Sequence, residues 1–357
     1  DYQSFDVINE VKQALLENHK LIPIRLAKIP KRRGGYRNVY ILSVRDRIRA
    51  RAIYRILEPL CEQAYSRFLF SYRSNHSSFF AGKSLAKRYR RSYKNDFVLT
   101  MDLKSYSDYI DHDILKEKLF EIGVDNEFYQ LLIPFIKVKL CQNGDMVDNT
   151  TGIPQGTPLT ALFANLYLNE VDKRVGPTVD FYRRVGDDLI VCDKNEVKVR
   201  EVYEILKAMV GELKLKISDK KTHILPPNQT FDFLGYTFSN GKISLDASFV
   251  KNLLFSWRKQ LAGPRGNVRS RLKRLGELAT KTNNNFEVQF RELFKQHPQI
   301  DYDQQIKKIS DQLYIYLTKF LYSKYTPRLR RLAMQQIKSI NFPSFYDYYL
   351  NFRRQKR

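Results

Sequence analysis

Cysteine and long apolar runs are what this sequence has least of. Its 357 residues include three cysteines, Cys61, Cys141 and Cys192, which are far apart and lack CxxC spacing. This argues against a disulfide framework and a zinc finger, and it favours a reducing, cytoplasmic setting. No run of eighteen or more apolar residues and no secretory signal pattern is present. We therefore expect a soluble protein with no membrane partner.

Acidic residues are also in the minority. The 38 Asp and Glu are outnumbered by 62 Lys and Arg, for a formal net charge of +24. Most single basic residues belong to a solvated surface, but those at 87–91, 265–274 and 353–357 are clustered. A field this positive attracts phosphate backbones, and some of the abundant Tyr and Phe could stack on bases or sugars. The composition predicts a nucleic-acid partner.

The most informative residues are two adjacent aspartates, Asp187 and Asp188, at the tip of a predicted hairpin at 181–191. Adjacent carboxylates repel and resist burial, so a near-apolar hairpin retains them chiefly when cations offset the charge. An isolated Gly-Asp-Asp is more often an exposed turn. However, Asp102 ends a second short apolar strand at 97–102 and supplies a third carboxylate. Such a cluster could hold two Mg²⁺ ions for in-line phosphoryl transfer.

Apolar periodicity predicts alternating strands and helices up to about residue 240, and helices alone beyond about 246. The first part begins with an amphipathic helix at 5–20 and a hairpin that turns at Gly34 and Gly35. Other helices are predicted at about 46–60, 84–94, 113–122, 126–140, 160–172 and 195–212, and a strand at 230–236. We expect an α+β core followed by a separate, basic helical unit.

Six segments carry a more specific signal. In chain order they are residues 29–48, 102–112, 152–165, 185–188, 218–223 and 233–236. Their order and content resemble the bacterial reverse transcriptase family. The likeness is to the branch of group II intron, retron and stand-alone defence-associated enzymes, and it covers roughly residues 25–240.

The resemblance implies a right-hand polymerase with α+β fingers and palm, built of an antiparallel sheet plus helices, and an all-helical thumb. Residues 1–95 would be the fingers with an N-terminal helix. Residues 96–240 would be the palm, which carries the catalytic carboxylates and includes inserted fingers-side helices at about 113–150. Residues 241–357 would be the basic thumb and C-terminal tail.

The same resemblance assigns the metal ligands. Asp102 and Asp187 would hold two Mg²⁺ ions, or Mn²⁺ in their place, and Asp188 would support them. The backbone carbonyl of Leu103 would add a further oxygen ligand. Carboxylate and carbonyl oxygens are the donors that these hard cations prefer.

Other positions would bind the incoming dNTP and the nucleic acid. Lys31 and Arg37 would clamp the β- and γ-phosphates, and Gln155 and Gly156 would lie beneath the templating base pair. Lys221 would donate a proton to the departing pyrophosphate, or would simply be a solvated lysine. The primer grip would be Phe233, Leu234, Gly235 and Tyr236, and the thumb residues on the duplex backbone would be Arg269, Arg271, Lys273 and Arg274.

Two departures from the family pattern bear on substrate choice. The family has Phe or Tyr five residues after the first catalytic aspartate, where the ring blocks a ribose 2′-hydroxyl, but this chain has Ser107. The neighbouring Tyr106 could supply the ring, with Tyr109 as a weaker candidate. Gly186 is typical of viral RNA polymerases, whereas the position of Asn165 fits reverse transcriptases. We expect DNA synthesis with reduced selectivity for the sugar.

The sequence thus predicts an RNA-directed DNA polymerase, a nucleotidyltransferase that binds an RNA template and makes DNA. The resemblance further implies a structured non-coding RNA as template and a role in bacterial antiphage defence, with a homo-oligomer or an accessory protein as open alternatives. One rival interpretation is an RNA polymerase or a template-relaxed nucleotidyltransferase with weak sugar discrimination. A second rival is a non-catalytic RNA-binding scaffold.

Overall fold

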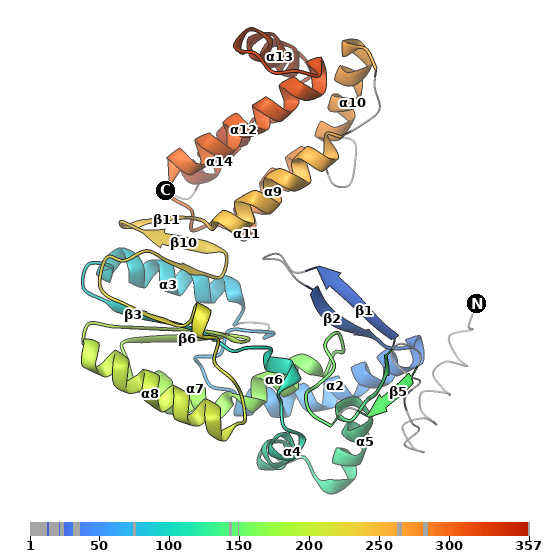
Figure 1. Cartoon of the computed structure of the whole chain (residues 1–357), viewed down its shortest axis with the longest axis vertical. Helices are drawn as coiled ribbons and strands as arrows, with labels where there is room; N and C mark the ends of the chain where they lie inside the picture. Colours follow the sequence, from blue (N-terminus) through green and yellow to red (C-terminus); the bar gives the residue numbers. More distant parts are fainter. Residues whose placement is uncertain are drawn as a thin grey trace. The chain divides into compact units, whose positions relative to one another are not determined.

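The computed structural model describes residues 13, 21, 25–30, 36–73, 76–142, 145–148, 150–262, 266–280 and 285–355. The chain divides into two compact units, residues 1–229 and 230–357, which are described separately (Figure 1). The helix predicted at 5–20, the residue Lys31 and the turn at Gly34 and Gly35 lie outside the described residues. None of the helices in the described part is long and apolar enough to cross a membrane.

A four-stranded antiparallel sheet organises the first unit. In spatial order its strands are β6 (Phe181–Val185), β7 (Asp188–Asp193), β3 (Phe97–Asp102) and β8 (His223–Leu225). These strands are rich in β-branched and aromatic residues, which suit a pleated, buried surface. The pairing of β3 with β7 sets Asp102 opposite Asp188. A slip of one residue would reverse the faces of every side chain, so burial fixes this register.

Helices pack around this sheet. They are α2 (Val44–Ala64), α3 (Ser78–Ser92), α4 (His112–Glu121), α5 (Asn126–Ile136), α6 (Thr160–Tyr167), α7 (Asn169–Val175) and α8 (Glu196–Glu212). Polar side chains cap several of them: Ser43 accepts from the N–H of Asp46 in α2, and Asn195 accepts at the start of α8. Helix α8 contacts both β3 and β7, so it covers one face of the sheet (Figure 1).

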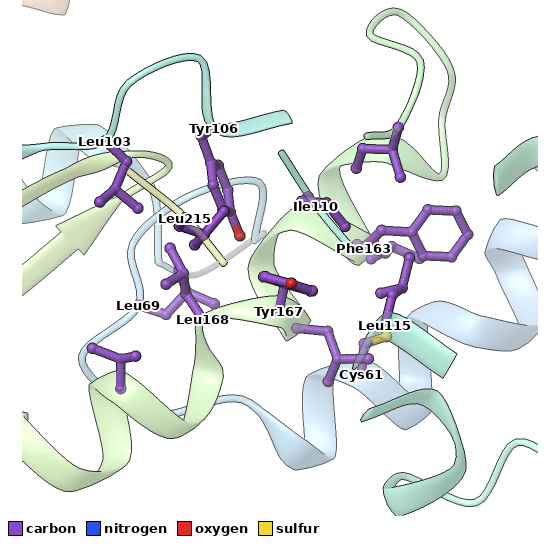
Figure 2. Packing of buried hydrophobic residues seen from close by; sticks show 14 of the residues in the cluster. Cys61, Leu69, Leu103, Tyr106, Ile110, Leu115, Phe163, Tyr167, Leu168 and Leu215 are labelled. Atoms are coloured by element: carbon purple, nitrogen blue, oxygen red, sulfur yellow. The ribbon is translucent and has the colours of Figure 1, made fainter. Parts of the chain in front are cut away.

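The core of the first unit lies between the sheet and these helices. Tyr106, Ile110 and Phe163 are almost fully buried there, with Leu215 and the free thiol of Cys61 in the same cluster (Figure 2). Burial raises the pKa of Cys61 to about 12, so this thiol is protonated and unreactive at neutral pH. The cluster fixes the loop after β3, and with it the segment that follows Asp102.

A hairpin formed by β1 (Arg25–Pro30) and β2 (Tyr36–Ile41) precedes α2, which confirms the prediction of a hairpin in this region. Two other predictions were wrong in their boundaries. The helix predicted at 126–140 ends at Ile136, and a second hairpin follows, formed by β4 (Lys139–Gln142) and β5 (Asp145–Asp148). The helix predicted at 160–172 is broken into α6 and α7 at Leu168, where φ is −98° and ψ is 3°.

The second unit begins with a small sheet and continues as helices. The strand predicted at 230–236 is two strands, β9 (Phe231–Phe233) and β10 (Tyr236–Ser239), and β11 (Lys242–Leu245) pairs with β10. Leu234 and Gly235 form the turn between β9 and β10, with φ of 51° and 82°. Two successive positive φ values define the type I′ turn that closes tight hairpins. A single straight strand was therefore the wrong interpretation.

The helical period predicted beyond residue 246 is confirmed. The helices are α9 (Ala247–Gln260), α10 (Val268–Thr280), α11 (Phe286–Gln296), α12 (Asp303–Tyr322), α13 (Pro327–Ser339) and α14 (Phe345–Gln355). Trp257 is fully buried at their centre and meets Phe290 and Phe345 edge to face, with centroids 5.5 and 5.2 Å apart. Aromatic contacts of this kind give the unit a core of its own.

Candidate active site

Three carboxylates meet at one end of the four-stranded sheet. Asp102 ends β3 and Asp188 begins β7, and the two residues are partners across the sheet. Asp187 occupies the turn between β6 and β7, where Gly186 has a φ of +65° that favours glycine. The backbone N–H of Leu103 donates to the carbonyl of Asp187 at 3.2 Å, which ties the turn to the end of β3. The hairpin predicted around the paired aspartates is confirmed.

The negative charges of these carboxylates repel one another. Burial, followed by the neighbouring Asp187 and Asp102, raises the pKa of Asp188 to about 7. One cation offsets part of the charge: Lys221 Nζ donates to Asp102 Oδ2 at 2.7 Å. A carboxylate cluster with a raised pKa in a cleft is a typical sign of a functional site.

The donor set fits divalent cations. Within the described residues, no three Asp, Glu, His or Cys side chains stand in an arrangement that could hold a metal ion as they are. However, Asp102 and Asp188 are partners across the sheet, and burial, followed by the charges of Asp187 and Asp102, raises the pKa of Asp188. Hard cations such as Mg²⁺ prefer carboxylate oxygens and would relieve this repulsion. Asp102, Asp187 and Asp188 are thus the residues that would hold the metals, beside the buried Leu103.

Two of the three carboxylates, Asp102 and Asp187, line a cleft of about 1040 Å³, whereas Asp188 is not part of its lining. The cleft brings together most of the positions that the sequence assigned to the metals and the incoming nucleotide. Those in its lining are Asp102, Leu103, Tyr106, Ser107, Gln155, Gly156, Asp187 and Lys221. Lys31 lies outside the described residues, and Arg37 is on β2 with its side chain outside them.

The floor of the cleft depends on a close approach between two backbones. Tyr40 N donates to the carbonyl of Gln155 at 2.8 Å, so β2 is joined to the loop that contains Gln155 and Gly156. Gly156 has a φ of +103°, and a Cβ there would lie 2.7 Å from Cγ1 of Val39. Only glycine combines this backbone conformation with this contact. Gly156 therefore lets the β1–β2 hairpin pack on the cleft.

The structure separates the roles of Tyr106 and Ser107. The Tyr106 side chain is 5% exposed, and its hydroxyl donates to the carbonyl of Ala164 in the core (Figure 2). Ser107 is half-buried and lines the cleft, and its carbonyl accepts from the N–H of Ile153 at 2.8 Å. The ring of Tyr106 is thus committed to packing, while Ser107 contributes a small residue to the lining of the cleft.

The second unit holds the remaining predicted residues. Leu234 and Gly235 form the β9–β10 turn, flanked by Phe233 and Tyr236, which are 5% and 6% exposed. On α10, Arg269 and Lys273 are exposed and Arg274 is half-buried. Arg271, the fourth predicted residue of α10, forms hydrogen bonds within the second unit.

Arg271 binds the end of α12 rather than pointing freely into solvent. Its Nη1 donates to the carbonyls of Phe320 and Leu321 at 3.0 and 3.1 Å and to Ser323 Oγ at 2.8 Å. Unpaired carbonyls at a helix C-terminus attract such cations. The sequence prediction grouped Arg271 with three phosphate-binding neighbours, but the structure gives it a stabilising contact within the unit.

Several residues that line the cleft were not assigned a role from the sequence, and three of them have side chains suited to bind nucleic acid. Arg47 and Arg51, one helical turn apart on α2, are exposed and line its wall. Tyr72 lines it too, with 70% of the residue exposed and a φ of +55°. The spacing of Arg47 and Arg51 was visible in the sequence, but many other basic residues share such spacing.

Comparison with known proteins identifies the class. The sequence pattern described as "Reverse transcriptase (RNA-dependent DNA polymerase)" matches residues 29–238. The chain therefore belongs to the reverse transcriptase family, whose members are RNA-directed DNA polymerases and so nucleotidyltransferases. The family predicted from the six sequence segments is confirmed.

Individual relatives agree. The chain is 25% identical over 264 residues to protein YkfC of Escherichia coli K12, a match that covers 63% of this chain and 69% of YkfC. It is 26% identical over 198 residues to the group II intron-encoded protein LtrA of Lactococcus lactis, covering 55% and 33% of the two chains. It is 26% identical over 163 residues to the retron Ec86 reverse transcriptase of E. coli, covering 44% and 47%. The chain thus spans about a third to a half of these last two relatives.

Solved structures support the fold. Telomerase from Candida albicans, solved with a fragment of telomeric RNA, superposes with a TM-score of 0.53 at 15% identity, over 94% of this chain and 65% of that one. Apo telomerase from Candida tropicalis gives 0.51 at 11% identity, over 96% and 68%. At such low identity the likeness concerns the fold alone. The predicted α+β polymerase fold is confirmed.

Proposed function

We propose that this chain copies RNA into DNA from dNTPs, using two divalent cations held by Asp102, Asp187 and Asp188. The observation that carries the proposal is the meeting of these three carboxylates at one end of the sheet, where Asp102 and Asp187 line a cleft. A pair of metals there would stabilise both the attacking and the leaving oxygen of an in-line displacement. A non-catalytic scaffold has no need to retain a carboxylate cluster whose members repel one another.

The chain's own residues position the reactants. The loop of Gln155 and Gly156 forms the floor on which a templating base pair would rest. Lys221 Nζ, 2.7 Å from Asp102 Oδ2, lies at the metal ligands and would give its proton to the departing pyrophosphate. We assign the clamp on the β- and γ-phosphates to Lys31 and Arg37 from the family pattern.

The small side chain at Ser107 supports weak discrimination between dNTPs and rNTPs. Ser107 lines the cleft, whereas the Tyr106 ring is buried and bound to the carbonyl of Ala164. A gate formed by Tyr106 would have to break that hydrogen bond and leave a cavity in the core. We therefore favour DNA synthesis with reduced sugar selectivity over a gate rebuilt from Tyr106. This feature also keeps open the rival in which ribonucleotides are the natural substrate.

The domain roles follow the family. We assign residues 1–95 to the fingers, 96–240 to the palm and 241–357 to the thumb, with a primer grip at the β9–β10 turn. The template we propose is a structured non-coding RNA, and the setting is bacterial antiphage defence in the cytoplasm. The resemblance to retron and intron-encoded enzymes and the formal net charge of +24 support this assignment.

Sequencing of nucleic acid that copurifies with the protein tests the proposal. We expect one RNA species to be enriched, together with DNA complementary to part of it. The Asp187→Ala variant should retain the RNA and lose the DNA. RNA products in place of DNA would favour the RNA polymerase, and RNA with no product from the natural protein would favour the scaffold.

A further inference from the structure

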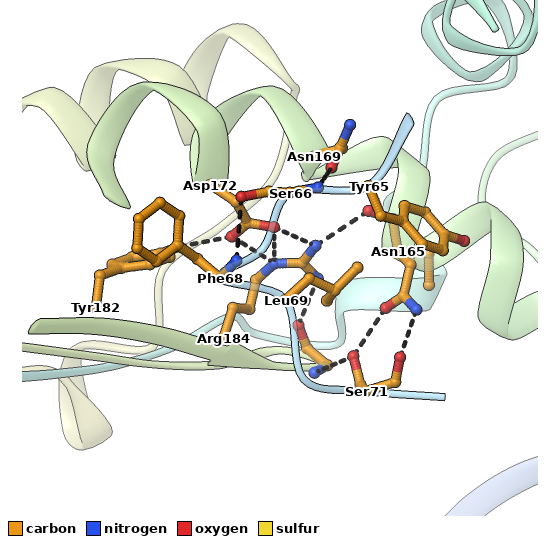
Figure 3. A network of polar contacts seen from close by, with 12 residues as sticks. Tyr65, Ser66, Phe68, Leu69, Ser71, Asn165, Asn169, Asp172, Tyr182 and Arg184 are labelled. Carbon is orange, nitrogen blue, oxygen red and sulfur yellow. Dashed lines mark hydrogen bonds and ion pairs between the residues drawn. The ribbon is translucent and has the colours of Figure 1, made fainter. Parts of the chain in front are cut away.

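The side chains of Ser71, in a distant loop, and Arg184, in strand β6, are shown in Figure 3. They hold both polar groups of the Gly186 backbone. Gly186 N donates to Ser71 Oγ at 3.0 Å, and the carbonyl of Gly186 accepts from Arg184 Nη1 at 3.1 Å. That carbonyl belongs to the peptide bond that leads into Asp187. The two contacts therefore fix the plane from which the Asp187 side chain departs.

Asn165 on α6 joins these two contacts into one unit. Ser71 Oγ donates to Asn165 Oδ1, and Asn165 Nδ2 donates to the carbonyl of Ser71, both at 2.8 Å. Arg184 Nη2 donates to the carbonyl of Asn165 at 3.0 Å. Asn165 is 1% exposed, so its amide has no water to replace these partners. We call Ser71, Asn165 and Arg184 the turn clamp.

The clamp rests on a buried ion pair. Arg184 and Asp172 are both fully buried, and Arg184 Nη2 lies 2.7 Å from Asp172 Oδ2. Tyr182 donates its hydroxyl to Asp172 Oδ1 at 2.7 Å as well. Apolar residues of similar volume often stabilise a fold as well as a buried ion pair does. Stability alone is therefore a weak reason for this pair. A better reason is orientation, because the pair holds the Arg184 guanidinium where it can donate to the Gly186 carbonyl.

The loop that carries Ser71 is itself anchored. Arg73 Nη1 donates to the carbonyl of Ser66 at 2.9 Å, and Arg73 Nη2 lies 2.7 Å from Glu62 Oε1. Asn169 Oδ1 accepts from the N–H of Ser66 at 2.8 Å. These contacts hold the loop in place, so the Ser71 hydroxyl has a fixed position beside Gly186. A residue that positions a functional group needs such support.

We propose that the turn clamp positions the Asp187 carboxylate for metal binding, and that Ser71, Asn165 and Arg184 are positioning residues of the polymerase. The inference rests on the proposed two-metal function. It predicts that loss of the Ser71 hydroxyl weakens metal binding without weakening the binding of nucleic acid. The clamp acts through the Gly186 backbone, whose N–H and carbonyl it holds.

The test compares three variants of the full chain. Ser71→Ala leaves the half-buried Gly186 N–H without its acceptor, while Ser71→Thr retains a hydroxyl. Ser84→Ala is the matched control, because Ser84 Oγ also accepts from a β6 residue, Arg183 Nε at 3.1 Å, but has no contact with the turn. Binding of Mn²⁺ alone is measured by electron paramagnetic resonance, and single-nucleotide incorporation is measured against Mg²⁺ concentration.

We expect Ser71→Ala to bind Mn²⁺ about fivefold or more weakly, as the loss of a partly buried hydrogen bond implies. Its Mg²⁺ requirement should rise in parallel, with unchanged affinity for an RNA–DNA duplex. Ser71→Thr should recover most of the affinity, and Ser84→Ala should match the natural protein. A folded Ser71→Ala protein with natural Mn²⁺ affinity would overturn the clamp. If the natural protein makes no DNA but Ser71→Ala still loses Mn²⁺ affinity, the polymerase proposal fails and the clamp stands.

Discussion

Asp102 and Asp188 lie directly opposite each other on β3 and β7, and Asp102 also lines the cleft. Burial, followed by the neighbouring carboxylates of Asp187 and Asp102, disfavours the charged form of Asp188 and raises its pKa to about 7. A cation at this end of the sheet removes that penalty. The register of one strand pair therefore connects the fold to the proposed chemistry.

The first prediction concerns sugar selectivity. Ser107→Phe should reject rNTPs roughly 10-fold or more strongly than the natural protein, because the ring would fill the space beside C2′. The measurement is single-nucleotide incorporation with matched dNTP and rNTP. Tyr106→Phe serves as the control, since it removes only the hydroxyl that binds Ala164. Strong natural discrimination that Tyr106→Ala abolishes would show that Tyr106 is the gate instead.

A second prediction concerns the packing of the β1–β2 hairpin on the cleft. Gly156→Ala forces a side chain into a φ of +103° with a contact of 2.7 Å to Val39. The strain should cost about 1–3 kcal/mol in unfolding free energy and should raise the KM for dNTP. Gly211→Ala is the control, because its Cβ would meet nothing within 4 Å. Equal effects of the two substitutions on KM and on urea unfolding would count against this role for Gly156.

The third prediction is a pH dependence of stability. The hydrogen bond from Lys214 Nζ at 2.6 Å, with two backbone N–H donors of α4, holds the pKa of Asp111 below its usual value. A lowered pKa in the folded state stabilises the fold above the unfolded pKa of about 3.9, and this stabilisation is lost as pH falls through the folded pKa. Asp111→Asn keeps a capping side chain but loses the charge.

For Asp111→Asn, urea unfolding should show a small loss of stability at pH 7 that shrinks as the pH falls below about 4. The loss should be small because the partner lysine is solvated. Lys214→Met should show the same pH dependence. A difference from the natural protein that grows toward acid would contradict the ion-pair account.

A fourth prediction separates the basic residues of α10. Neutralising Arg269 and Lys273, which are exposed, should flatten the salt dependence of RNA–DNA binding. Arg271→Ala should instead lower the unfolding free energy by about 1–3 kcal/mol, since the α12 carbonyls lose their buried donor. Filter binding at several salt concentrations and urea unfolding distinguish the two effects. A stability loss from Arg269→Ala equal to that from Arg271→Ala would show that exposure does not separate them.

The sequence revealed the carboxylates because Asp102 ends a short apolar strand and because Asp187 and Asp188 stand at a hairpin tip, and both features are local. The turn clamp could not be found in this way. Ser71 and Asn165 are 94 positions apart, and the segment that makes Asn165 notable in the sequence gives no sign that it contacts Ser71. Their meeting depends on the packing of the 66–73 loop against α6, which no local period encodes.

Some helix boundaries were predicted wrongly for a related reason. The apolar period at 160–172 is continuous, yet the chain bends at Leu168. Asn169 then lies where it can hold the N–H of Ser66, and Asp172 where it can pair with Arg184. Tertiary contacts of buried polar residues thus outweighed the helical period. The internal role of Arg271 was likewise invisible, because it depends on the distant end of α12.

Primer extension by Asp187→Ala tests the central claim most directly. The natural protein should extend a DNA primer on an RNA template in Mg²⁺ or Mn²⁺, and the variant should lose extension while its affinity for RNA stays nearly unchanged. Asp180→Ala is the control: its carboxylate pairs with Arg88 at 2.9 Å and does not line the cleft, so it should leave extension intact. Extension by Asp187→Ala at the natural rate would contradict the assignment of these carboxylates to catalysis.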